Sequence, residues 1–419
     1  MEGSRRWKQR RVDGAEATKD EGKALPPNLP IFQSSNLFYS VTNIGELYVP
    51  AECRDAVFAR PRVKLFARQE LVHLNRIFTH IRHGGVAVVE GEWEQITKVM
   101  DYIQRHKQDL IQHTDRNTKR RDQRDSHRRS ANHALKEALA KLVCWADADG
   151  ILQVEPAPVL PDLLELAGEP AGANQGKPFL LPVTKIQQIQ QALGETYPVR
   201  ALNAALVASE NVLAPRSQET IECFQEALQF VRHSNPATVA DIGCGSGCLT
   251  LLARQELGES VELYASDLLP EAIATTKLNL QRLLPDSDAV RVMPAGDLFD
   301  PFPSHQFDVI IFNAPWVVAR VRNRAELAIH DEKQKTVKRF FGQVSNFLKP
   351  DGTILLGYAD ASGPKAIDNL EGIIAEAGFR ENALFKRRVA THRSKRKWEQ
   401  IRVYALNQKS LEVTSISPP

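Results

Sequence analysis

Hydrophobic and polar positions follow two different rhythms along the 419-residue chain, and the first rhythm is helical. In residues 69–81 and again in residues 93–111, apolar residues recur every three to four positions, which is the spacing of a helix that buries one face. Residues 130–145 are rich in Ala and Leu and predict a third helix, while residues 86–89 are an apolar run that fits a short buried strand. We therefore expect a mainly helical N-terminal domain.

The second rhythm begins near residue 184 and alternates short apolar runs with helical stretches. Alternation of strands and helices is typical of an α/β fold with a doubly wound, mainly parallel sheet. We predict strands at residues 238–242, 261–266, 290–293, 308–312, 353–358 and 400–406.

Changes in composition divide the chain into segments. Residues 1–30 are polar, charged and end in a proline-rich stretch, so we predict a disordered basic tail. Residues 31–178 form the predicted helical domain, and its last part, residues 155–178, is rich in Pro, Gly and Ala and resembles a linker. Residues 179–410 form the predicted α/β domain, and residues 411–419 a short tail.

The composition is that of an ordinary soluble protein, with 42% hydrophobic and 25% charged residues. No apolar run approaches the roughly 18–20 residues that span a bilayer, and no apolar segment follows the basic N-terminus as it does in a secretory signal. The five cysteines are too few and too scattered for a disulfide framework. We expect a cytoplasmic protein without membrane association or a metal site, and the oligomeric state stays open.

Basic residues gather in two clusters, although the net charge is only +3. Such clusters bind the phosphates of RNA, but they also occur as solvated helix faces and charged hairpins, and both interpretations stay open. The first cluster consists of Arg116, Lys119, Arg120, Arg121, Arg124, Arg128 and Arg129, and the second of Lys386, Arg387, Arg388, Arg393, Lys395, Arg396 and Lys397.

A glycine-rich turn follows the first strand of the predicted α/β sheet. Residues 239–247 read Val-Ala-Asp-Ile-Gly-Cys-Gly-Ser-Gly. Ligands of open α/β sheets bind at the carboxyl ends of the strands, where the turn must pass close to the ligand. This close approach requires the glycines at Gly243, Gly245 and Gly247. The glycines alone are also compatible with a dinucleotide site.

Three carboxylates favour S-adenosyl-L-methionine (S-adenosylmethionine) over a dinucleotide. Asp241 ends the first strand, where it can order the turn and meet the positive amino-acid end of this cofactor. Asp267 ends the second strand, in position to accept the hydroxyl groups of a ribose. Asp297, followed by Leu298, comes after the third strand and can accept from the exocyclic amine of adenine. A dinucleotide would explain the glycines and Asp267 but not this third carboxylate.

The fourth predicted strand ends in a rigid polar tip, Asn313-Ala314-Pro315-Trp316. A planar nitrogen is a poor nucleophile because its lone pair is delocalised, so its N–H bonds must point at acceptors while the lone pair faces the methyl group. The side-chain oxygen of Asn313 and the carbonyl of Ala314 can accept these N–H bonds. Pro315 stiffens the turn, and Trp316 offers a ring face for stacking. Positioning of this kind supplies most of the rate.

Residues from about 203 to 406 resemble the class I S-adenosylmethionine-dependent methyltransferases. The tip resembles the Asn-Pro-Pro-Tyr family of N-methyltransferases, with Ala314 and Trp316 in place of Pro and Tyr. Residues 212–220, Val-Leu-Ala-Pro-Arg-Ser-Gln-Glu-Thr, are similar to a segment of the release-factor glutamine methyltransferases. The resemblance implies a seven-stranded, doubly wound, Rossmann-like domain. It also implies that Pro215 and Arg216 lie over the cofactor.

These patterns predict an N-methyltransferase that acts on a planar or weakly basic nitrogen held by Asn313 and its neighbours. We expect the acceptor to be a small metabolite or a peptide-like molecule. The alternatives are a nitrogen of an RNA base, to which the basic clusters would contribute, and the side-chain nitrogen of a protein glutamine. A protein that binds the cofactor or RNA without catalysis is an alternative of a different class.

Overall fold

The computed structural model describes residues 37–58, 62–111, 123–285, 290–390 and 397–409. The two predicted tails lie outside these residues. The arginine-rich first cluster falls where no side chain is described, and so does part of the second cluster. Residues from Leu37 onward belong to one compact unit.

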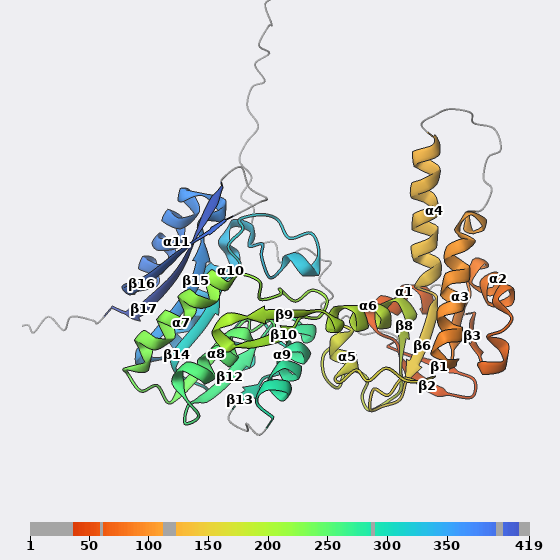
Figure 1. The fold of residues 1–419 in the computed structure, drawn as a ribbon, viewed down its shortest axis with the longest axis horizontal. Helices are drawn as coiled ribbons and strands as arrows, with labels where there is room; N and C mark the ends of the chain where they lie inside the picture. The colour runs from red at the N-terminus through yellow and green to blue at the C-terminus, as the bar shows by residue number, and fades with distance from the viewer. Residues whose placement is uncertain (1–36, 59–61, 112–122, 286–289, 391–396, 410–419) are drawn as a thin grey trace, which may run out of the picture. The chain divides into compact units, whose positions relative to one another are not determined.

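The N-terminal part contains a six-stranded mixed sheet besides its helices, so the prediction of a mainly helical domain is not confirmed (Figure 1). The strand order is β1-β2-β8-β6-β4-β3. These strands have only four or five residues, too few for a period of two to be distinguished from a helical segment. Their bounds are β1 (Phe38–Val41), β2 (Gly45–Tyr48), β3 (Val63–Phe66), β4 (Val86–Val89), β6 (Leu142–Ala146) and β8 (Phe179–Pro182).

Helices with a periodic apolar face were predicted well in this part. The first predicted helix corresponds to α2 (Leu74–Arg82), and the second to α3 (Trp93–Arg105), which buries Ile96, Val99, Met100 and Ile103. The predicted strand at residues 86–89 is β4. The third predicted helix is partly wrong, because α4 (Gln123–Leu139) ends early and Leu142–Ala146 continues as β6, buried at four of five positions.

The boundary between the two sheets lies further along the chain than we predicted. Strand β8 pairs with β6 in the N-terminal sheet, where Pro182 lies opposite Val143. The helix that follows, α6 (Val183–Gly194), packs Ile186 and Ile189 into the same hydrophobic core. Strand β8 and helix α6, residues 179–194, therefore belong to the N-terminal part of the fold. The short elements β5 (Gly91–Glu92), β7 (Val154–Glu155) and α5 (Leu163–Leu166) also belong to this part of the fold.

The C-terminal sheet has seven strands in the order β13-β12-β11-β14-β15-β17-β16, which confirms the predicted Rossmann-like α/β fold. Strands β13, β12, β11, β14 and β15 run parallel to one another, and β17 runs antiparallel to both β15 and β16. The bounds are β11 (Thr238–Ile242), β12 (Glu262–Ser266), β13 (Val290–Val292), β14 (Phe307–Asn313), β15 (Leu348–Ala359), β16 (Phe379–Ala390) and β17 (Trp398–Gln408).

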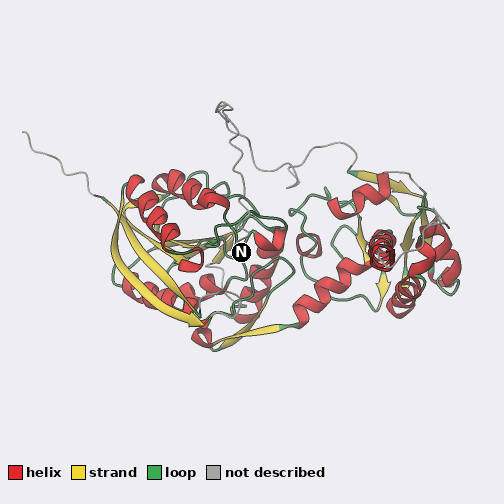
Figure 2. Ribbon diagram, turned by 90° about the horizontal axis from the view of Figure 1, so that it is seen from above, coloured by secondary structure: helices red, strands yellow, loops and turns green. Residues whose placement is uncertain are grey.

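Helices cover both faces of this sheet, as Figure 2 shows. Along β14, Val309 and Ile311 pack with residues of α7 and α8, whereas Ile310 and Phe312 pack with residues of α10 and α11. This alternation follows from the period of two along a strand. The helices are α7 (Gln218–Arg232), α8 (Cys248–Leu257), α9 (Pro270–Leu283), α10 (Lys335–Gln343) and α11 (Pro364–Glu376), and a hairpin of β9 (Thr196–Val199) and β10 (Ala204–Val207) precedes them.

Two further observations concern membrane spans and disulfides. Within the described residues, no helix is long and apolar enough to cross a membrane. The five cysteines are all buried and none forms a disulfide.

Candidate functional site

The direction of the chain connections reverses between β11 and β14, and the glycine-rich turn lies there. Gly243, Gly245 and Gly247 have φ angles of +72°, +57° and +74°, a region that favours glycine. The amide of Gly243 donates to the carbonyl of Ser266 at 2.8 Å, which ties the turn to the end of β12. At Gly247, a β-carbon would lie 3.0 Å from the Thr276 side chain of α9. The positive φ angles and the contact at Gly247 therefore favour glycine in this turn, and its close approach to a ligand stays a prediction.

Asp241 supplies an unsatisfied buried oxygen at the carboxyl end of β11. Its side chain is 2% exposed, and Oδ2 accepts a hydrogen bond from the Thr250 hydroxyl at 2.6 Å. Its Oδ1 has no hydrogen-bond partner among the described residues. Burial raises the pKa of Asp241 to about 7, and the nearby charge of Asp267 adds to the effect. Because a buried oxygen without a partner is costly, this position fits a ligand that carries a positive donor.

Asp267 is oriented by two backbone amides. Its Oδ2 accepts from the amide of Gly245 and its Oδ1 from the amide of Leu269, both at 2.9 Å. Burial raises the pKa of this carboxyl group to about 6, although the two amides act in the opposite direction. Each oxygen has a second lone pair, so the carboxylate can still accept from the hydroxyl groups of a ribose.

Asp297 has an ionic partner that the sequence did not reveal. The guanidinium of Arg339 in α10 pairs with Oδ2 of Asp297. The next residue, Leu298, is buried and has a φ angle of +49°, so the loop after β13 turns sharply here. Arg339 is 42 residues further along the chain, where no local pattern indicates the pairing.

Asn313 is the last residue of β14, and its side-chain oxygen is buried without a hydrogen-bond partner in the part of the chain that the structure describes. The neighbouring Ala314 donates its amide hydrogen to the carbonyl of Gly357 in β15 at 3.2 Å. Trp316 is partly buried and packs against the hydrophobic clusters on both faces of the sheet. Since β11 and β14 are adjacent and parallel, Asn313 and Asp241 share one edge of the sheet. Asp241 and Asn313, each with a side-chain oxygen that has no hydrogen-bond partner in the described residues, thus lie at the carboxyl ends of neighbouring strands.

The segment with Pro215 and Arg216 contacts β9 and the residue that joins α6 to it. The guanidinium of Arg216 lies 4.9 Å from the centroid of the Tyr197 ring and 3.4 Å from Glu195, and its side chain is 70% exposed. The next residue, Ser217, caps α7 by accepting from the amide of Thr220 at 3.3 Å. These contacts orient the segment toward the β9–β10 hairpin.

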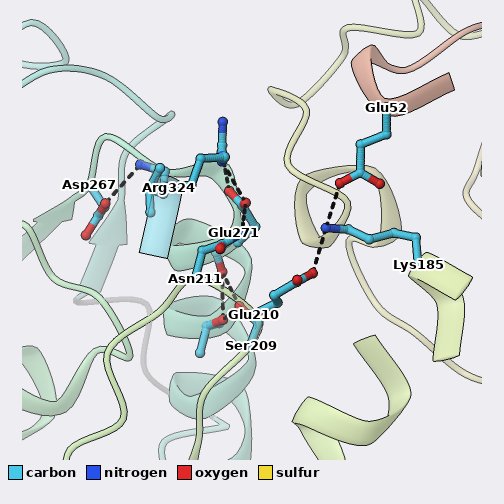
Figure 3. A network of polar contacts seen from close by, with 10 residues as sticks. Glu52, Lys185, Ser209, Glu210, Asn211, Asp267, Glu271 and Arg324 are labelled. Atoms are coloured by element: carbon cyan, nitrogen blue, oxygen red, sulfur yellow. Dashed lines mark hydrogen bonds and ion pairs between the residues drawn. The ribbon is translucent and has the colours of Figure 1, made fainter. Parts of the chain in front are cut away.

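A polar network beside the site involves residues that sequence reasoning missed (Figure 3). Its centre is Glu271, which is 1% exposed and lies in the first turn of α9. Arg324 and Asn211 donate to its carboxylate, and Ser209 donates to its backbone carbonyl. An acidic residue in the first turn of a helix is common, so nothing in the sequence distinguished Glu271 as the centre of a polar network.

Cys244 and Cys248 are both buried. The Cys244 thiol contacts the hydroxyl of Thr276 at 3.3 Å, and burial raises the pKa values of both thiols. No group of three or more potential ligands that could hold a metal ion occurs in the described residues.

The seven-stranded fold and its glycine-rich turn are typical of one class of enzyme, and sequence comparison indicates the same class. Residues 233–406 match the family model described as "Methyltransferase domain". Residues 233–406 therefore combine the sequence pattern of a methyltransferase domain with the seven-stranded α/β fold described above. The match begins near the end of α7 and includes nearly all of the seven-stranded sheet.

Curated relatives are similar to part of this chain. The release factor glutamine methyltransferase of Chlamydia trachomatis serovar L2 is 31% identical over 182 residues, which are 39% of this chain and 57% of that protein. The enzyme of the same name from Shewanella oneidensis is 25% identical over 216 residues, or 48% of this chain and 72% of that protein. The chain thus spans less than two thirds of the length of the Chlamydia relative.

A solved structure, the ribosomal protein L11 methylase of Lactobacillus delbrueckii subsp. bulgaricus, is 19% identical and aligns over 47% of this chain and 81% of that chain, with a TM-score of 0.33. At this TM-score the similarity supports no conclusion about fold or function.

Proposed function

We propose that this protein is an S-adenosylmethionine-dependent N-methyltransferase that methylates the side-chain amide nitrogen of a glutamine in a protein substrate. The observation that carries the proposal is the buried, unpartnered side-chain oxygen of Asn313 on the same sheet edge as the glycine-rich turn. The methyltransferase domain over residues 233–406 supports the reaction type.

The residues around the turn fit this cofactor. When bound, S-adenosylmethionine supplies a sulfonium-activated methyl group. Asp241 Oδ1 is in position to accept from its ammonium group, because no other donor occupies that oxygen in the described residues. Asp267 would hold the ribose hydroxyls, and Asp297, kept in place by Arg339, would accept from the adenine amine. Leu298, Pro215 and Arg216 remain predicted contacts of the same cofactor.

The tip would hold the acceptor nitrogen. The Asn313 side-chain oxygen would accept one N–H bond of the amide and the Ala314 carbonyl the other, so that the plane of the amide is fixed. The lone pair of the nitrogen then faces the methyl carbon, and Trp316 would stack against the amide plane. The nitrogen would gain the methyl group as the sulfonium becomes a neutral sulfide, and the proton that the nitrogen loses would pass to water. Orientation supplies most of the rate in such an arrangement.

The choice of substrate rests on the relatives. Several curated relatives are named release factor glutamine methyltransferases, and residues 212–220 resemble a segment of that family. A protein glutamine therefore has more support than the small metabolite that the sequence patterns placed first. The N-terminal sheet, which lies outside the matched domain, is a candidate for the part that recognises the protein substrate.

RNA is a second candidate substrate because of the basic cluster on β16. Lys386 and Arg388 are exposed on this strand, and their charged groups have no ionic partner among the described residues. Arg387 between them pairs with Glu226 of α7. Two unpaired cations on an edge strand can contact phosphate groups.

A labelled-methyl assay tests both candidates. Purified protein would be titrated calorimetrically with S-adenosylmethionine and then incubated with the tritiated cofactor and separate pools of cell protein and cell RNA. We expect binding, and label in the protein pool that mass spectrometry maps to glutamine. Label in RNA, weakened steeply by added salt, would favour the second candidate. A folded protein that does not bind the cofactor would overturn both.

A further inference from the structure

The carboxylate of Glu271 joins two segments that lie outside the sheet. Arg324 donates to Oε1 from Nε at 3.2 Å and to Oε2 from Nη2 at 2.7 Å, which is a bidentate pair. Asn211 donates to Oε1 at 3.1 Å. Glu271 is 1% exposed, so this carboxylate depends on these donors for its stability.

The topology places the segment that carries Arg324 across the glycine-rich turn. Arg324 belongs to the loop that leaves the tip at the end of β14, whereas Glu271 belongs to α9, which follows β12. Strand β11 lies between β12 and β14 in the sheet. A chain that runs from the end of β14 to the start of α9 must therefore pass the carboxyl end of β11, where the turn begins.

This loop, residues 317–331, is closed at its base. The amide of Val317 donates to the carbonyl of Ile329 at 2.9 Å, and the amide of Asp331 donates to the carbonyl of Val317 at 2.9 Å. The amide of Val318 donates to the hydroxyl of Ser362 at 2.7 Å. Its base is thus fixed beside the tip, and its far side is fastened through Arg324.

The segment before α7 reaches the same carboxylate from another direction. Ser209 donates to the backbone carbonyl of Glu271 at 3.1 Å, and Asn211 contacts its side chain. Between them, Glu210 accepts from Lys185 of α6 at 2.9 Å, and Lys185 also pairs with Glu52 of α1 (Ala51–Phe58) at 3.1 Å (Figure 3). The segment is therefore anchored to helices of the N-terminal part as well as to α9.

We propose that the Arg324–Glu271 ion pair, together with Asn211, is a clamp that holds residues 317–331 across the cofactor site. The clamp rests on the proposed function, because its purpose is to retain the bound cofactor while Asn313 orients the acceptor. Arg324, Glu271 and Asn211 are positioning residues, and they act through the loop and the segment that they fasten. The clamp carboxylate lies four residues after Asp267, so the pair is next to the proposed ribose contact.

The experiment compares the wild-type protein with Arg324→Gln and Arg324→Lys. S-adenosylhomocysteine is the probe, because it needs no acceptor substrate. Its dissociation rate would be measured by stopped flow, and amide hydrogen exchange of residues 317–331 would be measured with and without it. Arg322→Gln is the matched control, because Arg322 lies on the same loop and its exposed guanidinium contacts no acidic group in the described residues.

We expect Arg324→Gln to release the probe roughly tenfold faster, because a charged hydrogen-bonded pair is lost. The same variant should show faster exchange over residues 317–331 even without the probe. Its melting temperature should also fall, because the buried Glu271 carboxylate loses its charged donor. Arg324→Lys keeps the charge but not the bidentate geometry, so its rate of probe release should lie between those of the wild type and Arg324→Gln. Arg322→Gln should match the wild type.

Two failures can be told apart. If the wild-type protein does not bind the probe, the proposed function is overturned, and the retention role with it. If the wild type binds but Arg324→Gln and Arg324→Lys release the probe and exchange amides as the wild type does, the clamp alone is overturned. Should Arg324→Gln not fold, Arg324→Lys still tests the bidentate pair.

Discussion

The side-chain oxygen of Asn313 lies against the backbone of Gly357, the residue opposite it on β15. A β-carbon at position 357 would be 2.6 Å from this oxygen and 2.6 Å from the ring of Phe224. Both distances are shorter than any real contact of a β-carbon. The tip can therefore keep its orientation only because position 357 has no side chain.

Replacing Gly357 with Ala should displace the Asn313 side chain and lower methyl transfer. Overpacking of this kind costs about 1–3 kcal/mol of unfolding free energy. The measurement is chemical denaturation combined with the labelled-methyl assay. The matched control is Gly372→Ala in α11, where no atom lies within 4 Å of the added β-carbon. Because Ala favours a helix over Gly, the control should gain roughly 0.5–1 kcal/mol. Unchanged turnover in Gly357→Ala would show that the packing of Asn313 is unimportant.

Removing the side-chain oxygen of Asn313 should abolish acceptor orientation and leave the cofactor in place. We expect Asn313→Ala to lower the turnover number by about 10²–10³-fold, as for other catalytic hydrogen-bonding groups. The dissociation constant for S-adenosylmethionine, measured by calorimetry, should stay within about twofold. The control is Asn346→Ala, since Asn346 is exposed and lies before β15, outside the proposed site. Full turnover by Asn313→Ala would refute the role of the tip.

Cofactor affinity should rise with pH because Asp241 must be ionised to accept from an ammonium group. Burial raises the pKa of Asp241 from 3.8 to about 7, so the ionised fraction increases roughly tenfold between about pH 6 and pH 8. Calorimetric dissociation constants should therefore fall by roughly that factor over the same range. The stability of the ligand-free protein should change in the opposite direction. The pKa of Asp241 is higher in the folded protein than in the unfolded chain, so this carboxyl group stabilises the fold at pH values below its unfolded pKa. The contribution is lost as the pH rises through about 7.

The variant Asp241→Asn separates this effect from that of Asp267. It should bind the cofactor weakly and lose the dependence centred near pH 7. A smaller dependence should remain at lower pH, because burial raises the pKa of Asp267 to about 6. If Asp241→Asn kept the pH profile of the wild type, another group would be responsible for it.

The C-terminal sheet was predictable because its buried parallel strands are continuous apolar runs. Strand β14 illustrates this, since six residues from Phe307 to Phe312 include five that are fully buried. The N-terminal sheet was not predictable in the same way. Strands such as β8 have four residues, all buried, and a short apolar run does not distinguish a strand from a helix.

The site was predictable where its residues follow strand ends, and hidden where its contacts are long-range. Asp241 and Asn313 come directly at the ends of recognisable strands, so the topology alone brings them together. Arg324 and Glu271 are 53 residues apart, and neither residue belongs to a local motif. An ion pair of this kind depends on the path of a loop, which hydrophobic periodicity does not encode.

Lys185 should stabilise the protein through its two carboxylate partners. Its side chain is 4% exposed, between Glu52 at 3.1 Å and Glu210 at 2.9 Å. Burial alone would lower the pKa of Lys185, but the two carboxylates outweigh it and raise the pKa above its ordinary value. The interaction of Lys185 with the two carboxylates therefore stabilises the protein at pH values below the pKa of lysine in the unfolded chain. This stabilisation is lost as the pH rises through the raised pKa of Lys185.

Replacing Lys185 with Met should lower the unfolding free energy at neutral pH by about 1–3 kcal/mol. The loss should not be larger, because Glu52 and Glu210 are each more than one third exposed and can be rehydrated. The measurement is urea denaturation at neutral and at alkaline pH, where the difference from the wild type should shrink as lysine deprotonates. Lys98→Met is the control, because Glu94 is its one ion-pair partner in the described residues. The two side chains lie on an exposed helix face, so the loss of Lys98 should leave the midpoint unchanged. Equal midpoints for Lys185→Met and the wild type would show that Lys185 does not anchor the segment before α7.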